Sequence, residues 1–178
     1  GGLIDNAWRG RVSDVCVLGL SPDSAEPRLY VEDWLFGAGR PCILYPDSSK
    51  QKFSADNVLI CWDFSRSAAR TVSDALPFLH NAKRVNVAVF RGEKDIPIAD
   101  PTTPLIAFLK EHGIAVEAKD VVIGKRTIGQ AILEHAETTG VNLILMGAFG
   151  HSRLREFLLG GATRELLAKS TIPILMSH

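Results

Sequence analysis

The sequence predicts an α/β fold, with an open five-stranded parallel sheet and helices on both faces. From residue 57 onward, short apolar runs rich in β-branched residues alternate with longer stretches whose apolar residues recur every three or four positions. The first pattern is typical of buried strands and the second of amphipathic helices. Strands and helices that alternate in this way form parallel sheets covered on both faces. The apolar fraction of 46% is sufficient for a packed core.

The first strand and its helix open this pattern. The bounded apolar run NVLICW, residues 57–62, predicts a buried strand. A helix is expected over residues 65–79, because alanine, valine and leucine recur there at spacings of three and four. Asp63 or Ser65 can serve as the N-cap of this helix.

The second and third strands follow, with one helix between them. The run RVNVAVF, residues 84–90, predicts the second strand. After a loop rich in proline and aspartate, a helix is expected over residues 104–112, closed by Gly113. The alternating run IAVEAKDVVI, residues 114–123, predicts the third strand.

The last two strands each follow a helix. Residues 127–139 predict a helix that ends at Gly140, and LILM, residues 143–146, predicts the fourth strand. A further helix over about residues 153–169 leads to PILM, residues 173–176, as the fifth strand.

The N-terminal segment, residues 1–54, does not complete such a cycle. It contains the apolar run DVCVLGL at residues 14–20, a helix near residues 30–36 and the Pro-led run PCILY at residues 41–45. The C-terminal end of the chain has the same order of elements: a strand, a helix, a glycine-rich point and a Pro-led strand. We therefore interpret this segment as the end of an earlier, related copy that is cut short. An unrelated N-terminal extension is the alternative.

Composition narrows the range of partners. Twenty basic and twenty acidic residues leave no net charge, so no basic excess is available to bind nucleic acid. No apolar stretch approaches the roughly 20 residues of a membrane span. Cys16, Cys42 and Cys61 each lie in a short apolar run, which predicts reduced, buried side chains of a cytoplasmic protein rather than disulfides or metal ligands.

The most informative stretch follows the fourth strand. Gly147 and Gly150 lie three positions apart directly after this strand, where they let the backbone turn and expose its N–H groups. A helix N-terminus follows, and its partial positive charge favours an anion. Gly160 and Gly161 add a second stretch of bare backbone. These features indicate a phosphate site, although many strand-to-helix turns contain glycine without binding phosphate.

The pattern Gly-x2-Gly-x9-Gly, after the strand LILMG and before a Pro-led final strand, resembles that of the universal stress protein family. The runs VLICWDFSRSAARTV, AILEHAETTGVNLILMGAFGHSRL and KSTIPILMSH support the resemblance, which covers residues 57–178. It implies a Rossmann-like sheet with strand order 3-2-1-4-5. The whole chain resembles a tandem-type member, with the remnant of a degenerate first copy at residues 1–48, a linker at residues 49–56 and a nucleotide-binding copy at residues 57–178.

The resemblance also implies where a nucleotide would bind. In nucleotide-binding members, ATP lies across the carboxyl ends of the first, second and fourth strands. Asp63 would contact the adenosine end, with Trp62 close by, and Phe90 would meet adenine through its main chain. Gly147 would border the ribose. The residues that would surround the phosphates are Gly150, His151, Gly160, Gly161, Ala162 and Thr163.

Some of these residues have other interpretations. Asp63 could cap the following helix, and Trp62 and Phe90 could be ordinary core aromatics. Gly161 stands where the family usually has Ser or Thr, so its N–H can reach a phosphate but a hydroxyl contact is missing. A hydrogen bond to a charged group contributes about 1.5–3 kcal/mol, so weakened ATP binding is expected.

The predicted function is that of a cytoplasmic stress-response module that binds ATP, or alternatively AMP or ADP, and regulates rather than catalyses. A Mg²⁺ or Mn²⁺ ion would be held mainly by the phosphates, since no protein ligand cluster is visible. The resemblance implies a homodimer or a pseudo-dimer through the final strands, with residues 41–45 against residues 173–176. One alternative is an interaction scaffold of the same fold without nucleotide. The other is a weak ATPase or nucleotidyl transferase, for which only His151 and Asp63 are candidates.

Overall fold

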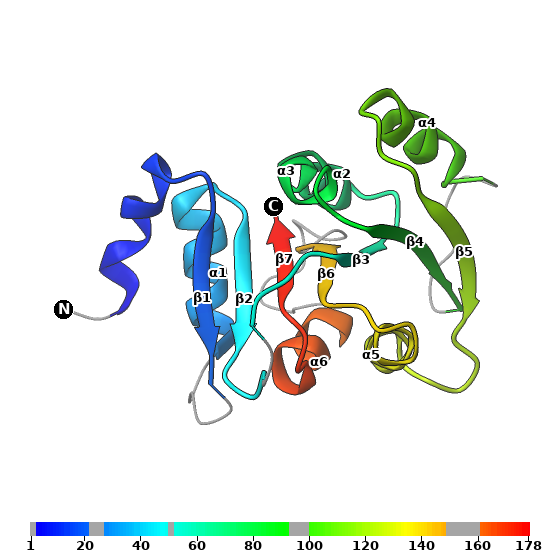
Figure 1. Cartoon of the computed structure of the whole chain (residues 1–178). Helices are drawn as coiled ribbons and strands as arrows, with labels where there is room; N and C mark the ends of the chain where they lie inside the picture. Colours follow the sequence, from blue (N-terminus) through cyan, green and yellow to red (C-terminus); the bar gives the residue numbers. More distant parts are fainter. Residues whose placement is uncertain (1–2, 22–26, 50–51, 93–99, 149–160) are drawn as a thin grey trace.

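The computed structural model contains one seven-stranded sheet, in the order β1-β2-β7-β6-β3-β4-β5 (Figure 1). The structure describes residues 3–21, 27–49, 52–92, 100–148 and 161–178. The strands are β1 (Cys16–Leu20), β2 (Cys42–Pro46), β3 (Asn57–Cys61), β4 (Arg84–Arg91), β5 (Glu117–Val122), β6 (Leu143–Gly147) and β7 (Ile174–Ser177).

The five strands β3 to β7 have the predicted order. Counted along the chain from β3, they are arranged 3-2-1-4-5, and each neighbouring pair among them is parallel. These five strands are part of a larger sheet, because β2 pairs antiparallel with β7, as expected for residues 41–45 against residues 173–176, and β1 then pairs parallel with β2. The main-chain groups of β7 are thus paired on both sides, which a terminal strand cannot achieve.

The helices cover both faces of the sheet, as predicted. Val31, Ile132 and Leu166 pack in one apolar cluster, on the face that carries α1, α5 and α6. Val72 and Leu109 pack in a second cluster, on the face of α2, α3 and α4. Figure 1 shows α2 to α4 along the upper side of the sheet and α5 and α6 along the lower side. The helices are α1 (Pro27–Ala38), α2 (Arg66–Asp74), α3 (Leu76–Leu79), α4 (Thr103–Glu111), α5 (Ile128–Thr138) and α6 (Gly161–Lys169), with a 3₁₀ helix η1 (Leu3–Val12).

The helix predicted over residues 65–79 is divided in two. Its first part, α2, ends at Asp74, and α3 begins at Leu76. Pro77 explains the division, because it has no N–H to donate to the carbonyl four residues earlier. Predicted strand 114–123 is also shorter, since β5 covers only Glu117–Val122. The first part of the helix predicted over residues 153–169 lies outside the described residues.

All three cysteines are free and buried, as predicted. Cys16 and Cys42 lie opposite each other on β1 and β2. Burial raises the pKa of the Cys42 thiol to about 12, and it also raises the pKa of Cys61. These side chains are therefore neutral thiols at physiological pH and act as small apolar residues. Within the described part of the chain, no helix is long and apolar enough to cross a membrane.

One buried hydroxyl joins α2 to the two strands beneath it. Thr71 Oγ1 accepts a hydrogen bond from Ser177 N of β7 at 3.1 Å. The same atom lies 2.8 Å from Ser67 O and 3.2 Å from Met146 O of β6, and it donates its proton to one of them. Thr71 is only 1% exposed, so water cannot replace these partners.

Thr71→Val should destabilise the protein by about 1–3 kcal/mol, because the Ser177 N–H loses its partner in a dry environment. Urea unfolding followed by circular dichroism measures this change. Thr71→Ser keeps the hydroxyl and is the matched control. Equal unfolding free energies for the two variants would show that the hydroxyl contributes nothing.

Candidate functional site

The register of the sheet gathers four of the predicted site residues at one edge. Cys61, the last residue of β3, lies opposite Ala88 of β4 and Met146 of β6. From each of these three strands, the chain continues past the level of Cys61 in the same direction, because the strands are parallel. The residues concerned are Trp62, Asp63, Phe90 and Gly147. They therefore meet at the carboxyl edge of three neighbouring strands, where open α/β sheets bind their ligands.

The turn between β3 and α2 resolves the two possible caps. Ser65 is the N-cap, since its side chain accepts a hydrogen bond from Ala68 N at 3.1 Å. Asp63 Oδ1 accepts from Ser65 N at 3.0 Å and so braces the turn instead of capping the helix. Phe64 between them has a φ of 60°, in the left-handed region that non-glycine residues rarely adopt. This turn is a locally strained, hydrogen-bonded connection at the predicted site.

The side chain of Trp62 is part of the core. It is 7% exposed, and its indole N–H donates to Pro101 O at 2.7 Å, next to the start of α4. Its ring makes an edge contact with Phe64, with the ring centroids 6.0 Å apart. Phe64 is 38% exposed and offers an aromatic surface at this edge, which the sequence analysis did not identify. A large aromatic residue between a strand-end Asp and an N-cap Ser was the available signal.

Phe90 contributes its main chain to the edge and its side chain to the core. Its ring packs edge-on against His135 of α5, with centroids 6.0 Å apart. Burial, and then the positive charge of Lys119, lower the pKa of His135, so its ring is neutral at physiological pH. Ala88 O accepts from Trp62 N. The main-chain groups of Phe90, two residues further on, point to the same side, beyond the last paired residue of β3.

Gly147 is required by close packing. A Cβ atom at this position would lie 2.5 Å from Ala68 N and 2.8 Å from Ser67 C, at the start of α2. Real Cβ atoms do not approach backbone atoms this closely, so only glycine permits α2 to lie here. The predicted border to a ribose stays a prediction, but the structure supplies an independent reason for the residue.

The N-terminus of α6 holds the remaining described residues of the predicted site. Gly161 is exposed, and a Cβ atom added there would meet nothing within 4 Å. Thr163 is 5% exposed and Ala162 is half-buried. Gly150, His151 and Gly160 lie outside the described residues, so the phosphate side of the site stays a prediction. The part of the chain that is described contains no group of three or more His, Cys, Asp or Glu residues able to hold a metal ion.

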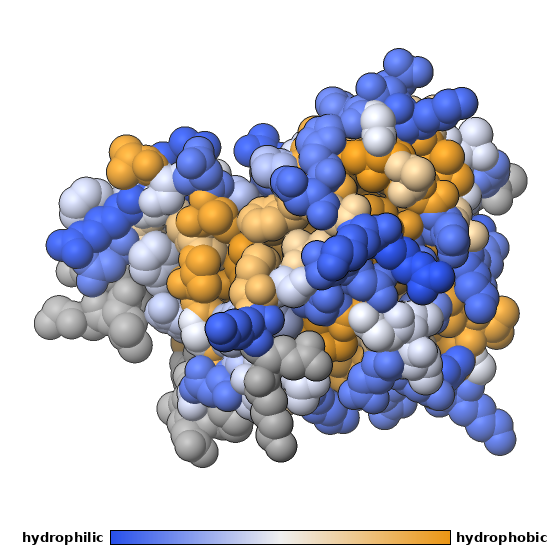
Figure 2. Space-filling model, viewed as in Figure 1, coloured by the Kyte–Doolittle hydropathy of each residue, from blue (hydrophilic) through white to orange (hydrophobic). Residues whose placement is uncertain are grey.

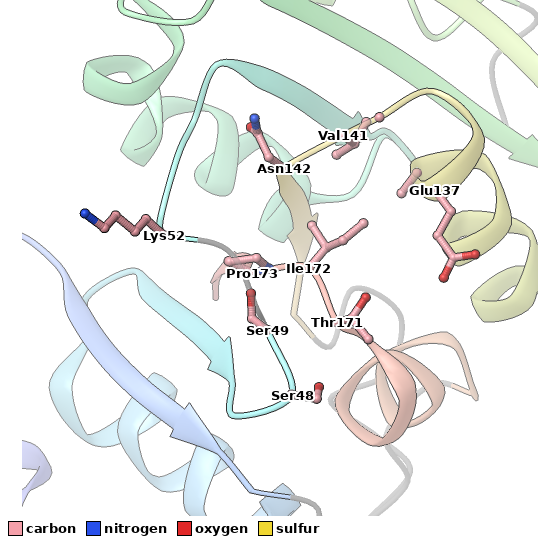
Figure 3. Close-up of a pocket in the computed structure, with 11 residues that line it drawn as sticks. Ser48, Ser49, Lys52, Glu137, Val141, Asn142, Thr171, Ile172 and Pro173 are labelled. Atoms are coloured by element: carbon pink, nitrogen blue, oxygen red, sulfur yellow. The ribbon is translucent and has the colours of Figure 1, made fainter.

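A cavity of about 450 Å³ lies at the opposite end of the sheet (Figure 3). Its lining comes from the turn after β2, the end of α5 and the segments that lead into β6 and β7. Asn142 and Pro173, which immediately precede these strands, are among the lining residues. The cavity therefore opens at the amino edge, and it includes none of the predicted nucleotide-site residues.

A family comparison accounts for this arrangement. The model of the Universal stress protein family matches residues 55–178. The chain belongs to this family. The match begins two residues before β3 and ends with the chain, so it includes the whole carboxyl edge described above.

Individual relatives agree with this membership. Universal stress protein Slr1230 of Synechocystis is 28% identical over 142 residues, which cover 76% of this chain and 46% of Slr1230. Universal stress protein MJ0577 of Methanocaldococcus jannaschii is 33% identical over 66 residues, covering 35% of this chain and 38% of MJ0577. The matched part thus spans less than half the length of these curated relatives.

Solved structures share the fold. A universal stress protein from Archaeoglobus fulgidus superimposes with a TM-score of 0.73 and 18% identity, over 97% of this chain and 65% of that one. The crystal structure of MJ0577 superimposes with a TM-score of 0.53 and 25% identity, over 67% of this chain and 93% of that one.

Gly147→Ala should destabilise this family member by about 1–3 kcal/mol, because α2 must move away from β6 to admit the methyl group. Chemical denaturation measures the change. Gly19→Ala is the control, since a Cβ atom at Gly19 would approach only Asp47 Oδ1, at 3.7 Å. If both substitutions have the same small effect, the close approach at Gly147 does not constrain the fold.

Proposed function

We propose that the chain binds an adenine nucleotide, ATP in the first place, and acts as a regulatory stress-response module. The observation that carries the proposal is the meeting of Asp63, the Phe90 main chain and Gly147 at one edge of the sheet. This edge belongs to the family-matched part of the chain, and the glycine pattern after β6 continues from it. A ligand here would contact main-chain groups more than side chains.

Each residue has one proposed role. Asp63 contacts the ribose or adenosine end, and the outward main chain of Phe90 meets adenine, with the exposed ring of Phe64 beside it. Gly147 keeps the ribose side clear. The phosphates bind the main-chain N–H groups around Gly150 and at the start of α6, where the helix dipole favours an anion. Any Mg²⁺ or Mn²⁺ is coordinated mainly by the phosphates.

A regulatory role fits the chemistry of this edge better than catalysis does. Of the two candidates for catalysis, Asp63 already accepts a hydrogen bond from Ser65 N, and His151 lies outside the described residues. An acid–base catalyst needs a titratable group within reach of the reacting atoms. One observation favours a nucleotide-free scaffold as the second candidate: Gly161 has no hydroxyl to offer a phosphate.

We also infer that residues 1–48 are the closing part of an earlier, first copy of the fold. β2 pairs antiparallel with β7, centred on Ile43 opposite Leu175. On the outer sides, β1 pairs parallel with β2, and β6 pairs parallel with β7. The strands β1-β2-β7-β6 are therefore arranged symmetrically about this central pair. Such symmetry supports a tandem organisation and a pseudo-dimer within one chain. A homodimer through β7 would have to displace β2.

Isothermal titration with ATP tests nucleotide binding. Saturable heat at micromolar to millimolar ATP is expected, and Asp63→Ala should weaken it about tenfold by removing the adenosine contact. Asp56→Ala is the matched control, because Asp56 flanks the other end of β3 and is half exposed. Absence of heat at millimolar ATP and AMP would leave the scaffold.

Gly161→Ser should strengthen ATP binding. The space at this position is open, and a serine hydroxyl could donate to a phosphate oxygen, a bond of about 1.5–3 kcal/mol. Gly161→Ala adds the Cβ atom without the hydroxyl and should leave the affinity nearly unchanged. An equal gain in both variants would show that helix stabilisation, and not a phosphate contact, causes it.

A further inference from the structure

The two terminal strands of the sheet differ in chemistry. β5, at one end, carries Glu117, Lys119 and Asp120 among its six residues, and Asp120 pairs with Arg91 at 2.9 Å. Charged side chains of this kind discourage further strand pairing. β1, at the other end, has the sequence CVLGL and carries no charge. Within the described part of the chain, β1 is therefore an edge without the usual protection.

Within the described residues, no strand pairs with the main chain of β1 at this edge. Cys16 N donates to Pro41 O, and Leu20 O accepts from Asp47 N, so the even-numbered residues of β1 bond on the side of β2. In a strand, the residues between them direct their N–H and C=O groups to the opposite side. Val17 and Gly19 thus offer donors and acceptors outward, where a further parallel strand could pair.

One face of β1 is also uncovered. The symmetry about Ile43 and Leu175 makes Val17 equivalent to Leu145, because each lies opposite one of the two central residues. Leu145 is completely buried, whereas Val17 is 66% exposed. Figure 2 shows an apolar surface over β1, in the same view as Figure 1. A helix covers this face at β6 and none of the described helices covers it at β1.

The equivalent glycines show what could cover it. Gly19 lies opposite Tyr45, as Gly147 lies opposite Ser177. The space in front of Gly147 is filled by the first turn of α2, which follows β3 after the turn at residues 62–65. The corresponding space at Gly19 is open, with Asp47 Oδ1 the nearest atom at 3.7 Å. β1 thus has the same kind of surface as β6. On β6 this surface is covered by β3 and α2, whereas on β1 none of the described elements covers it.

We propose that the edge and open face of β1 form a docking surface for a strand–turn–helix segment of the β3–α2 kind. The strand pairs parallel with β1, and the first helical turn, built from small residues, lies against Gly19. The segment comes from a universal-stress-type copy outside residues 1–178. This inference rests on the proposed repeat relationship and is independent of nucleotide binding.

The closest available probe is a synthetic peptide with the sequence of residues 55–75 of this chain. In the folded chain this segment lies along Leu143, Leu145 and Gly147 of β6. The equivalent positions are Val17 and Gly19 of β1 and Val15 just before it. The two surfaces are chemically alike. A fluorescent form of the peptide is titrated onto the full chain under reducing conditions, and binding is followed by anisotropy. Amide hydrogen exchange is measured in parallel.

Saturable binding is expected, with slower exchange at the Val17 and Gly19 amides and unchanged exchange in β5. Gly19→Val and Val17→Lys should each weaken binding about tenfold or more, by blocking the helix and by charging the apolar face. Val17 is exposed, so its substitution does not threaten folding. Val122→Glu, at a 73% exposed valine on the other edge strand, is the matched control and should leave binding unchanged.

Three results would overturn the proposal: no binding of the peptide, binding that Gly19→Val and Val17→Lys do not alter, or protection of β1 that grows with the concentration of the chain alone. The last result would mean that β1 pairs with a second copy of this chain. ATP titration of the same variants distinguishes a failure of the docking proposal from a failure of the nucleotide proposal. Gly19 and Val17 lie on β1, several strands away from the proposed nucleotide edge. Loss of peptide binding with unchanged ATP heat would concern only the docking surface.

Discussion

The close approach of α2 to β6 is the contact on which the rest of this structure depends. Gly147 lets the first turn of α2 lie against the end of β6, closer than any side chain would permit. Thr71, in the next turn, then reaches both β6 and β7 with its hydroxyl. The turn before α2 is held by Ser65 and Asp63, so the helix position also determines where Asp63 lies. Packing and the proposed binding edge are thus consequences of one backbone contact.

The antiparallel pairing of β2 with β7 decides the form of the whole sheet. It joins the N-terminal segment to the family-matched part through three pairs of opposing residues, Cys42 to Leu44 against Ile174 to Met176. These side chains are nearly all fully buried, so the junction is part of the hydrophobic core rather than a surface contact. The two parts therefore share one continuous sheet, and the strand that would otherwise be an exposed edge is covered.

At the carboxyl edge, the described side chains mainly make contacts within the protein. Trp62 uses its indole N–H on Pro101 O, Phe90 packs against His135, and Asp63 braces its own turn. Main-chain groups, an exposed Phe64 ring and a helix N-terminus are left to meet a ligand. Such groups suit the proposed recognition of a planar base and an anion. The cavity at the amino edge lies away from all of them.

The periodicity of the sequence predicted most of the fold. The alternation of apolar runs and amphipathic stretches identified the strands and helices from residue 57 onward, because burial on both faces requires these two patterns. The same reasoning missed the break at Pro77, because apolar periodicity continues across it. It also gave β5 too many residues, since local apolar patterns do not report which strand end is paired. The ten predicted site residues came from the family resemblance, and the structure describes seven of them.

The sequence by itself determined the family, the order of the elements and the glycines that permit tight turns, since these follow from local pattern and residue type. Only the tertiary structure decided that Gly147 supports α2, that Trp62 is a core residue, that Phe64 is exposed at the edge and that β1 is left open whereas its symmetric counterpart β6 is covered. Each of these depends on which segments distant in the chain come into contact, and contact at a distance leaves no trace in a local pattern.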